Sequence, residues 1–239
     1  MRQEEFKKAL EGLNIKWTDR CLSQLKVYCD FLLEYNKHTN LTAIRNEEDV
    51  YLKHFYDSLT IVKAVDLNDI DTLLDIGSGA GFPGLVLKIF YPHLSLTLID
   101  SNNKKTKFLK QVVDKLGLIN IEIENDRVEN FSLYHLNSFD LVTARAVASM
   151  RVLSEISLPL VNVEGFFVAM KGKGEEELSE AQQTIDIMGG KVVLNEVFFL
   201  YHDEGERSLI KIQKIRDTKE NELRSYEKII KKPLQKNGK

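Results

Sequence analysis

The sequence predicts an α/β fold in which a mostly parallel, doubly wound sheet follows a helical N-terminal extension. From residue 71 onward, apolar runs of strand length alternate with stretches of helical period. The first run, residues 72–76, leads through a glycine-rich turn into a helical pattern, which is how a βαβ unit begins. The last two runs are separated only by residues 201–206, too short a link for a crossover. A terminal β-hairpin with an antiparallel strand should therefore close the sheet.

Residues 1–66 carry helical patterns and form the predicted N-terminal extension. A short helix is expected at 4–11, and Thr18 is placed to cap a second helix that ends near His38. A third helix should span about 47–64, because acidic residues at its start suit the positive end of a helix dipole. We expect this extension to pack on the sheet domain.

The sheet domain should span 67–216, followed by a basic C-terminal helix or tail at 217–239. The last 34 residues hold 11 Lys or Arg against 5 Asp or Glu, although the whole chain has a net charge of -3. A nucleic-acid contact and a solvated basic tail both fit this asymmetry. The expected strands are 72–76, 94–99, 119–124, 139–144, 164–170, 192–200 and 207–214, and the expected helices are 82–90, 102–116, 149–161 and 174–188.

The glycine-rich turn after the first strand indicates the class of ligand. Gly77 and Gly79, with Ser78 between them, would let a ligand lie against bare main chain, where a Cβ would collide. The dinucleotide fingerprint needs a third small residue where Phe82 stands. Asp75, two residues before the first glycine, suits an ammonium group better than a pyrophosphate. S-adenosylmethionine carries an ammonium group and no phosphate, so we expect it here; a plain tight turn is the alternative.

Two further strand ends carry candidate cofactor-binding residues. Asp100, followed by Ser101, ends the second strand 23 residues after Gly77, where related folds hold ribose hydroxyls. An exposed turn acid is the alternative reading of Asp100. After the third strand, Asp126 can accept a hydrogen bond from an amine such as that of adenine, and Val128 can cover a ring face.

Arg145 follows the fourth strand, where a methyl-accepting group would approach. The alternative is an ion pair with a neighbouring carboxylate. As a surface residue, Arg145 could be replaced by Ala at a cost to stability of no more than about 0.5 kcal/mol. His54 and Asp57, one turn apart on the third helix, are expected to be a structural hydrogen-bonded pair.

Several motifs that target other acceptors are missing. The fourth strand does not end in the Asn/Asp-Pro-Pro-Tyr/Phe motif of amino-group methyltransferases, and both cysteines lie in the N-terminal extension, far from the site. Acceptors that are already nucleophilic remain, such as nitrogen 7 of guanine, whose lone pair needs no deprotonation. Catalysis could then rest on positioning and exclusion of water.

Together these residues resemble the bacterial ribosomal RNA small subunit methyltransferase G family, also called glucose-inhibited division protein B, from about residue 30 to 215. The resemblance implies a Rossmann-like class I S-adenosylmethionine-dependent methyltransferase sheet and formation of 7-methylguanosine in a 16S rRNA loop near the decoding centre. By the same analogy Gly77, Phe82, Val128, Glu129 and Arg145 line the cofactor site. The motifs that carry it are Asn40-Leu41-Thr42, His54-Phe55-Tyr56-Asp57-Ser58-Leu59, Leu74-Asp75-Ile76-Gly77-Ser78-Gly79-Ala80-Gly81-Phe82-Pro83-Gly84, Arg127-Val128-Glu129 and Thr143-Ala144-Arg145-Ala146.

The resemblance implies that the partner is 16S rRNA or the small ribosomal subunit, and we expect a monomer. The remaining features suggest a cytoplasmic protein without metal or membrane. Cys21 and Cys29 lie eight residues apart on one expected helix, about 12 Å along its axis, too far to bridge. The histidines show no ligand-like spacing, and no apolar run approaches transmembrane length. Two alternatives stay open: an oxidoreductase with a nicotinamide or flavin cofactor, against which Phe82 argues, and a non-catalytic RNA-binding protein, against which the intact glycines argue.

Overall fold

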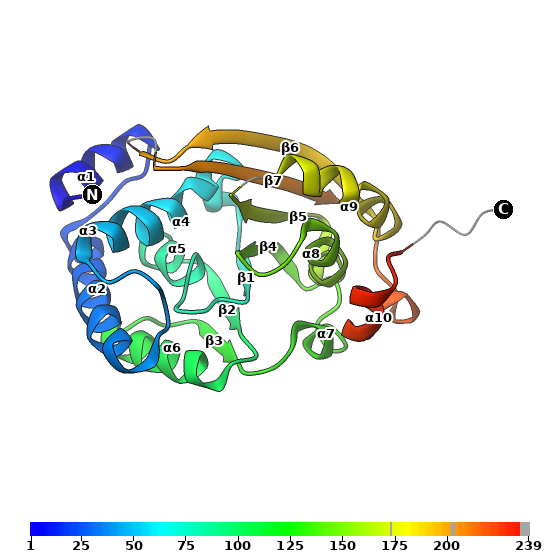
Figure 1. Cartoon of the computed structure of the whole chain (residues 1–239), viewed down its shortest axis with the longest axis horizontal. Coiled ribbons are helices and arrows are strands. Elements are labelled where there is room, and N and C mark those ends of the chain that lie inside the picture. Colours follow the sequence, from blue (N-terminus) through cyan, green and yellow to red (C-terminus); the bar gives the residue numbers. More distant parts are fainter. Residues whose placement is uncertain (173, 202–203, 235–239) are drawn as a thin grey trace.

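A seven-stranded sheet forms the centre of the molecule in the computed structural model, which describes residues 1–172, 174–201 and 204–234 (Figure 1). The strand order is β3-β2-β1-β4-β5-β7-β6. The first five strands run parallel to one another. Their bounds are β1 Thr72–Ile76, β2 Ser95–Ile99, β3 Ile121–Glu124, β4 Phe139–Arg145, β5 Val161–Lys171, β6 Gly190–Phe199 and β7 Glu206–Lys214. The α/β sheet predicted from the sequence is therefore confirmed.

The terminal hairpin is also confirmed, with one difference in its placement. β7 pairs antiparallel with both β5 and β6, so the antiparallel strand lies inside the sheet and β6 forms the edge. The short link between β6 and β7 makes them antiparallel neighbours, but it leaves open which of the two adds to β5. Along β6, half-buried and exposed positions alternate regularly, as expected for an antiparallel strand with one face towards solvent.

Helices cover both faces of the sheet and divide the core in two (Figure 1). Leu73 of β1 packs with the N-terminal helices, whereas its neighbour Leu74 packs with the helices of the other face, as strand alternation requires. The first face carries α1 Gln3–Gly12, α2 Asp19–Thr39, α5 Gly84–Phe90 and α6 Asn103–Leu116. The opposite face carries α8 Met150–Ser157, the 3-10 turn Leu158–Leu160 and α9 Glu175–Ile187.

The third predicted helix forms, but it is not a regular α-helix. It comprises α3 Glu47–Asp49, a π-helical stretch Val50–Tyr56, α4 Asp57–Leu59 and a 3-10 turn Thr60–Lys63. π-helical turns are rare and often occur at functional sites. The second helix begins as predicted, because the Thr18 side chain accepts a hydrogen bond from the Cys21 backbone N–H at 3.2 Å. Residues 1–66 share one hydrophobic core with the sheet.

The C-terminal residues form a docked segment. After β7 come the 3-10 turn Glu220–Glu222 and the helix α10 Tyr226–Lys231, which packs against α8. The remaining short elements are the 3-10 turn Leu67–Asp69 and α7 Val128–Phe131. Residues 235–239 of the predicted basic tail lie outside the described residues. Among the helices that the structure describes, none is long and apolar enough to cross a bilayer.

Candidate active site

The turn after β1 is held open by hydrogen bonds that leave its outer side bare. The backbone N–H groups of Gly77 and Ser78 both donate to the Ile99 carbonyl, which ties the turn to the end of β2. Gly77 has a φ of 67°, and a Cβ there would come within 2.6 Å of Val147. A Cβ on Gly79 would meet only the Gly77 carbonyl, at 3.8 Å, so the space beside it is free for a ligand.

Ser78, a predicted cofactor contact, points into the protein. Its side chain is buried, and its hydroxyl donates to the Asp75 carbonyl at 2.8 Å. Ser78 thus shapes the turn from within. Any contact of this residue with a ligand would have to involve its main chain.

Asp75 lies fully buried beneath the turn. Its Oδ2 accepts from the Gly84 backbone N–H at 2.8 Å, whereas Oδ1 has no hydrogen-bond partner in the described structure. Burial raises the pKa of this carboxyl to about 7, although the Gly84 N–H and the charge of Arg145 act in the opposite direction. A buried acceptor without a partner is costly. The nearby ammonium group of S-adenosylmethionine would favour the ionised form, so the residue present fits this cofactor.

A cavity of about 270 Å³ opens beside the turn, at the carboxyl ends of β1, β2, β3 and β4. Of the predicted cofactor-binding residues, six line it: Gly77, Asp100, Ser101, Asp126, Val128 and Glu129. The opposite wall is apolar and comes from the loop after β4 and from α8. A pocket with acids on one side and an apolar wall on the other suits a nucleoside. We call it the cofactor cavity.

Asp100 is positioned by three donors. Its Oδ2 accepts from the Gly79 N–H at 3.0 Å and from Lys105 Nζ at 3.2 Å, and its Oδ1 accepts from the Asn102 N–H at 2.9 Å. These bonds hold the carboxylate at the end of β2 and link it to the glycine turn. Oδ2 already accepts two hydrogen bonds, whereas Oδ1 accepts one and keeps a further acceptor site, so Asp100 can still bind a hydroxyl. Ser101 beside it is exposed.

The segment after β3 forms the far wall of the cofactor cavity. Asp126 is exposed, and its Oδ1 accepts from the Arg127 N–H and from Asn130 Nδ2. Val128 and Glu129 begin the short helix α7, where the sequence predicted a loop. Val128 is almost completely buried. This wall also includes Tyr226 from the C-terminal segment, which sequence analysis missed.

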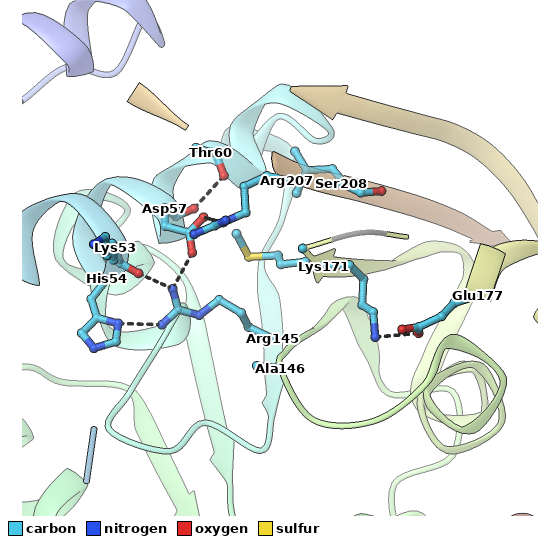
Figure 2. A pocket seen from close by; sticks show the side chains of 13 residues that line it. Lys53, His54, Asp57, Thr60, Arg145, Ala146, Lys171, Glu177, Arg207 and Ser208 are labelled. Atoms are coloured by element: carbon cyan, nitrogen blue, oxygen red, sulfur yellow. Dashed lines mark hydrogen bonds and ion pairs between the residues drawn. The ribbon is translucent and has the colours of Figure 1, made fainter. Parts of the chain in front are cut away.

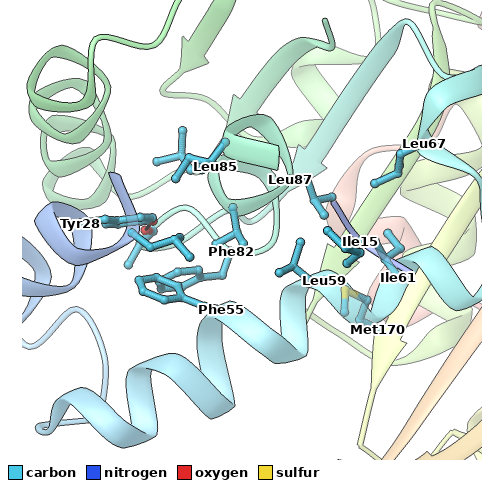
Figure 3. Close-up of a cluster of buried hydrophobic side chains, with 14 of the residues drawn as sticks. Ile15, Tyr28, Phe55, Leu59, Ile61, Leu67, Phe82, Leu85, Leu87 and Met170 are labelled. Carbon is cyan, nitrogen blue, oxygen red and sulfur yellow. Dashed lines mark hydrogen bonds between the residues drawn. The ribbon is translucent and has the colours of Figure 1, made fainter. Parts of the chain in front are cut away.

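Phe82 lies in the core, away from the cofactor cavity. Its ring stacks on Tyr28 of α2, with centroids 5.4 Å apart, and on His54, with centroids 4.3 Å apart. Figure 3 shows it among Tyr28, Phe55 and Leu85. The resemblance places Phe82 in the lining of the cofactor site, but it is not among the residues around that cavity. Its bulk instead joins the turn to the N-terminal helices.

A second cavity of about 420 Å³ adjoins the first at Ala146. Figure 2 shows Arg145 pointing from the end of β4 towards the π-helical stretch, where it meets Lys53, His54 and Asp57. We call this second cavity the acceptor cavity. Four basic and two acidic side chains are among those that line it: Lys53, Arg145, Lys171, Arg207, Asp57 and Glu177.

Asp57 connects two arginines in this cavity. Its Oδ2 accepts from Arg145 at 2.9 Å, and its Oδ1 accepts from Arg207 Nε of β7 at 2.8 Å. Since the Asp57 side chain is only 7% exposed, both ion pairs are shielded from water. Arg145, whose side chain is 15% exposed, is therefore an ion-pair partner of Asp57, as the alternative interpretation held. Its removal should then cost more stability than the about 0.5 kcal/mol expected for a surface residue.

His54 contacts Arg145 and makes no hydrogen bond to Asp57 that the structure describes. Arg145 can only donate, so His54 Nδ1 accepts from it at 3.2 Å. Burial and the charge of Arg145 lower the pKa of His54 to about 3, so the ring is neutral at pH 7. Its hydrogen then sits on Nε2, which donates to Thr42 Oγ1 at 2.9 Å. The predicted hydrogen bond between His54 and Asp57 is therefore wrong, because each side chain binds the Arg145 guanidinium instead.

Sequence analysis missed the basic residues that other elements bring to the acceptor cavity. Lys53, Lys171 and Arg207 come from the π-helical stretch, β5 and β7. Lys171 pairs with Glu177 of α9 at 2.7 Å. Only Lys171 could have been predicted, because it ends β5, and parallel strands next to β4 end at the same edge of the sheet. Within the described ranges, no group of three His, Cys, Asp or Glu side chains is arranged to hold a metal ion.

Comparison with known proteins identifies the family. The family model described as rRNA small subunit methyltransferase G matches residues 21–209. Proteins named "Ribosomal RNA small subunit methyltransferase G" from Lactobacillus acidophilus and Staphylococcus carnosus are 45% and 46% identical, over 91% and 86% of this chain and 93% and 87% of theirs. A solved SAM dependent methyltransferase from Aquifex aeolicus shares the fold, with a TM-score of 0.53 at 19% identity, covering 73% of this chain and 97% of that one. The chain belongs to the rRNA small subunit methyltransferase G family and is an S-adenosylmethionine-dependent methyltransferase.

Proposed function

We propose that this enzyme methylates nitrogen 7 of a guanine in 16S rRNA, in a loop near the decoding centre of the small ribosomal subunit. The observation that carries the proposal is the junction of two cavities at the end of β4, where Ala146 lines both. One cavity has the acids and the bare main chain that suit S-adenosylmethionine. The other has a basic lining that suits a nucleotide. The names of the relatives support rRNA as the substrate.

The site residues divide between the cavities. Asp100, Ser101, Asp126, Val128 and Glu129 would bind the cofactor, together with the turn at Asp75, Gly77, Ser78 and Gly79. The cofactor supplies a methyl group on a sulfonium, which a lone pair can attack directly. Residues of one chain line both cavities, which supports a monomer. A cytoplasmic location is supported by the proposed substrate, because ribosomes are assembled there. The division into a helical extension (1–66), a methyltransferase domain (67–216) and a basic C-terminal helix or tail (217–239) remains part of this proposal.

The chain supplies positioning, with no need of a general base. The lone pair on nitrogen 7 of guanine is free at neutral pH, so no proton has to be removed before attack. Both carboxylates in the acceptor cavity are in ion pairs, and His54 already accepts from Arg145. A correctly oriented acceptor in a shielded site can account for several kcal/mol of the barrier, by order of magnitude.

Arg145 is the proposed catalytic residue. The Lys53 carbonyl, Asp57 and His54 fix its guanidinium in the acceptor cavity. Arg145 was also expected to contact the cofactor, but it is not among the residues around the cofactor cavity; its neighbour Ala146 lines both. Arginine often donates to guanine O6 and N7 together, but a donor on N7 would block the attacking lone pair. We therefore assign Arg145 to O6. Lys53, Lys171 and Arg207 would contact phosphates around the flipped base.

The test is methyl transfer from labelled S-adenosylmethionine to 16S rRNA and to intact small subunits, followed by mapping of the product nucleoside. We expect 7-methylguanosine at one loop position. Calorimetry with S-adenosylhomocysteine and with NAD addresses the oxidoreductase alternative, and tighter binding of NAD would reverse the assignment. A deletion strain whose rRNA lacks no methyl group would instead support a non-catalytic RNA-binding protein.

A further inference from the structure

The C-terminal segment reaches the cofactor cavity. We use this name for residues 223–231, which lie beyond the part of the chain that the family model matches. Tyr226, at the start of α10, is one of the residues that line the cofactor cavity. Its ring lies next to Arg127, the residue before α7, and α10 itself packs against α8. No sequence motif pointed to this residue.

The segment is fixed to the fold by specific contacts. Arg224 donates through Nε and one terminal nitrogen to the two carboxylate oxygens of Glu155, at 2.6 and 2.7 Å. The Glu155 side chain is only 2% exposed, and such two-point pairs are geometrically specific. Arg151 of α8 donates to the Ile229 carbonyl, and the Ile229 side chain is buried in the core of that face. The Arg224 guanidinium is therefore paired within the protein, whereas a solvated RNA-binding tail would leave its charges exposed.

The position of Tyr226 corresponds to one end of the ligand. Gly77, Asp100 and Asp126 follow β1, β2 and β3, which are neighbours in that order along the sheet edge. If Asp100 binds the ribose, the amino-acid part lies towards Gly77 and the base lies towards Asp126. The Arg127 guanidinium lies 5.2 Å from the centre of the Tyr226 ring, so a cation–π contact holds the ring beside Asp126.

We propose that Tyr226 packs against the adenine of the bound cofactor, so that the C-terminal segment completes the cofactor site. This inference rests on the proposed location of that site. The apolar Val128 would face the base from α7, and the exposed part of the Tyr226 ring would cover it from α10. An aromatic ring that stacks on a base contributes about 1–3 kcal/mol. The expected contribution corresponds to roughly tenfold in affinity.

The test compares ligand affinities of full-length variants by calorimetry, with S-adenosylhomocysteine and with 5′-methylthioadenosine, which keeps the adenine and lacks the amino-acid part. Tyr226→Ala should weaken both ligands by about tenfold, because the lost contact is to the base. Tyr226→Phe should bind both as the wild type does. Tyr134→Ala is the matched control, since Tyr134 is 85% exposed and lines neither the cofactor nor the acceptor cavity.

Asp100→Ala separates this inference from the proposed site. Weaker binding in Asp100→Ala with unchanged binding in Tyr226→Ala would overturn the role of Tyr226 and leave the site intact. Unchanged binding in both variants would show that the cofactor binds elsewhere. A loss in Tyr226→Ala for S-adenosylhomocysteine alone would also count against a contact to adenine. Arg224→Ala, which releases the segment from Glu155, should reproduce the loss seen in Tyr226→Ala.

Discussion

The guanidinium of Arg145 lies 2.9 Å from the Asp57 carboxylate, which joins the end of β4 to the N-terminal helices. The same carboxylate accepts from Arg207 of β7. One buried acid thus fixes two cations from strands on opposite sides of β5. This arrangement makes the N-terminal extension part of the acceptor cavity, and it fixes the position of Arg145 next to Ala146, which lines both cavities.

Arg145→Ala should lose most methyl-transfer activity and some stability. Its removal leaves Asp57 with one partner and removes a cation that lies 5.3 Å from the Phe82 ring centre. Because Arg207 remains, we expect a loss of about 1–3 kcal/mol in the free energy of unfolding. Chemical denaturation measures the stability, and single-turnover transfer measures the activity.

Arg207→Ala is the matched control for Arg145, since it removes the other partner of the same carboxylate. It should lose a similar amount of stability but less single-turnover activity. Arg145→Lys should keep the charge without the planar set of donors that reaches Lys53, Asp57 and His54, so it should retain stability more fully than activity. Equal activity losses in Arg145→Ala and Arg207→Ala would argue against direct contact between Arg145 and the acceptor.

Gly77→Ala should weaken cofactor binding by about tenfold or more. The new methyl group would displace Val147, which lines the cofactor cavity, and the positive φ adds about 1–2 kcal/mol of strain. Gly117 offers a clean comparison, because its φ is also positive, at 60°, and nothing lies within 4 Å of a Cβ there. Gly117→Ala should cost similar stability and leave the affinity for S-adenosylhomocysteine unchanged. Equal affinities for S-adenosylhomocysteine in Gly77→Ala and Gly117→Ala would contradict the assignment of the glycine-rich turn to the cofactor site.

Asp75→Asn should change the pH dependence of stability in a defined direction. Burial raises the pKa of Asp75 from 3.8 to about 7 in the folded protein, so between these values the folded state holds a proton that the unfolded state has released. The contribution of this residue therefore becomes less favourable as the pH rises from about 4 to 7, by at most about 1.4 kcal/mol per unit. Above pH 7 it is constant.

Relative to the wild type, Asp75→Asn should thus gain stability steadily over that window and no further above it. Denaturation at several pH values measures the difference between the two proteins, which cancels the other titrating groups. His54 acts in the opposite sense, because its lowered pKa makes its contribution fall as the pH drops below 6.5. A difference that does not vary with pH would show that Asp75 is ionised throughout.

The sequence predicted the sheet and one side of the site well, because both follow from local patterns. The apolar runs and glycine turn are consecutive residues, and Asp100 and Asp126 follow strands whose neighbours are fixed by the parallel fold. Tyr226 and Arg207 could not be found in this way. Each reaches the site through a tertiary contact, Arg224 with Glu155 in one case and the pairing of β7 with β5 in the other. Periodicity carries no information about such contacts.

The position of Phe82 shows a different limit and leads to the last prediction. The family resemblance implied contact with the cofactor, yet the Phe82 ring stacks between Tyr28 and His54, and the residue is 4% exposed. Phe82→Leu should therefore cost about 1–3 kcal/mol of stability through lost packing. The affinity for S-adenosylhomocysteine should stay within about threefold of the wild type, which is less than 1 kcal/mol. Calorimetry of the folded variant measures this affinity. A loss of affinity as large as that expected for Gly77→Ala would show that Phe82 belongs to the cofactor site.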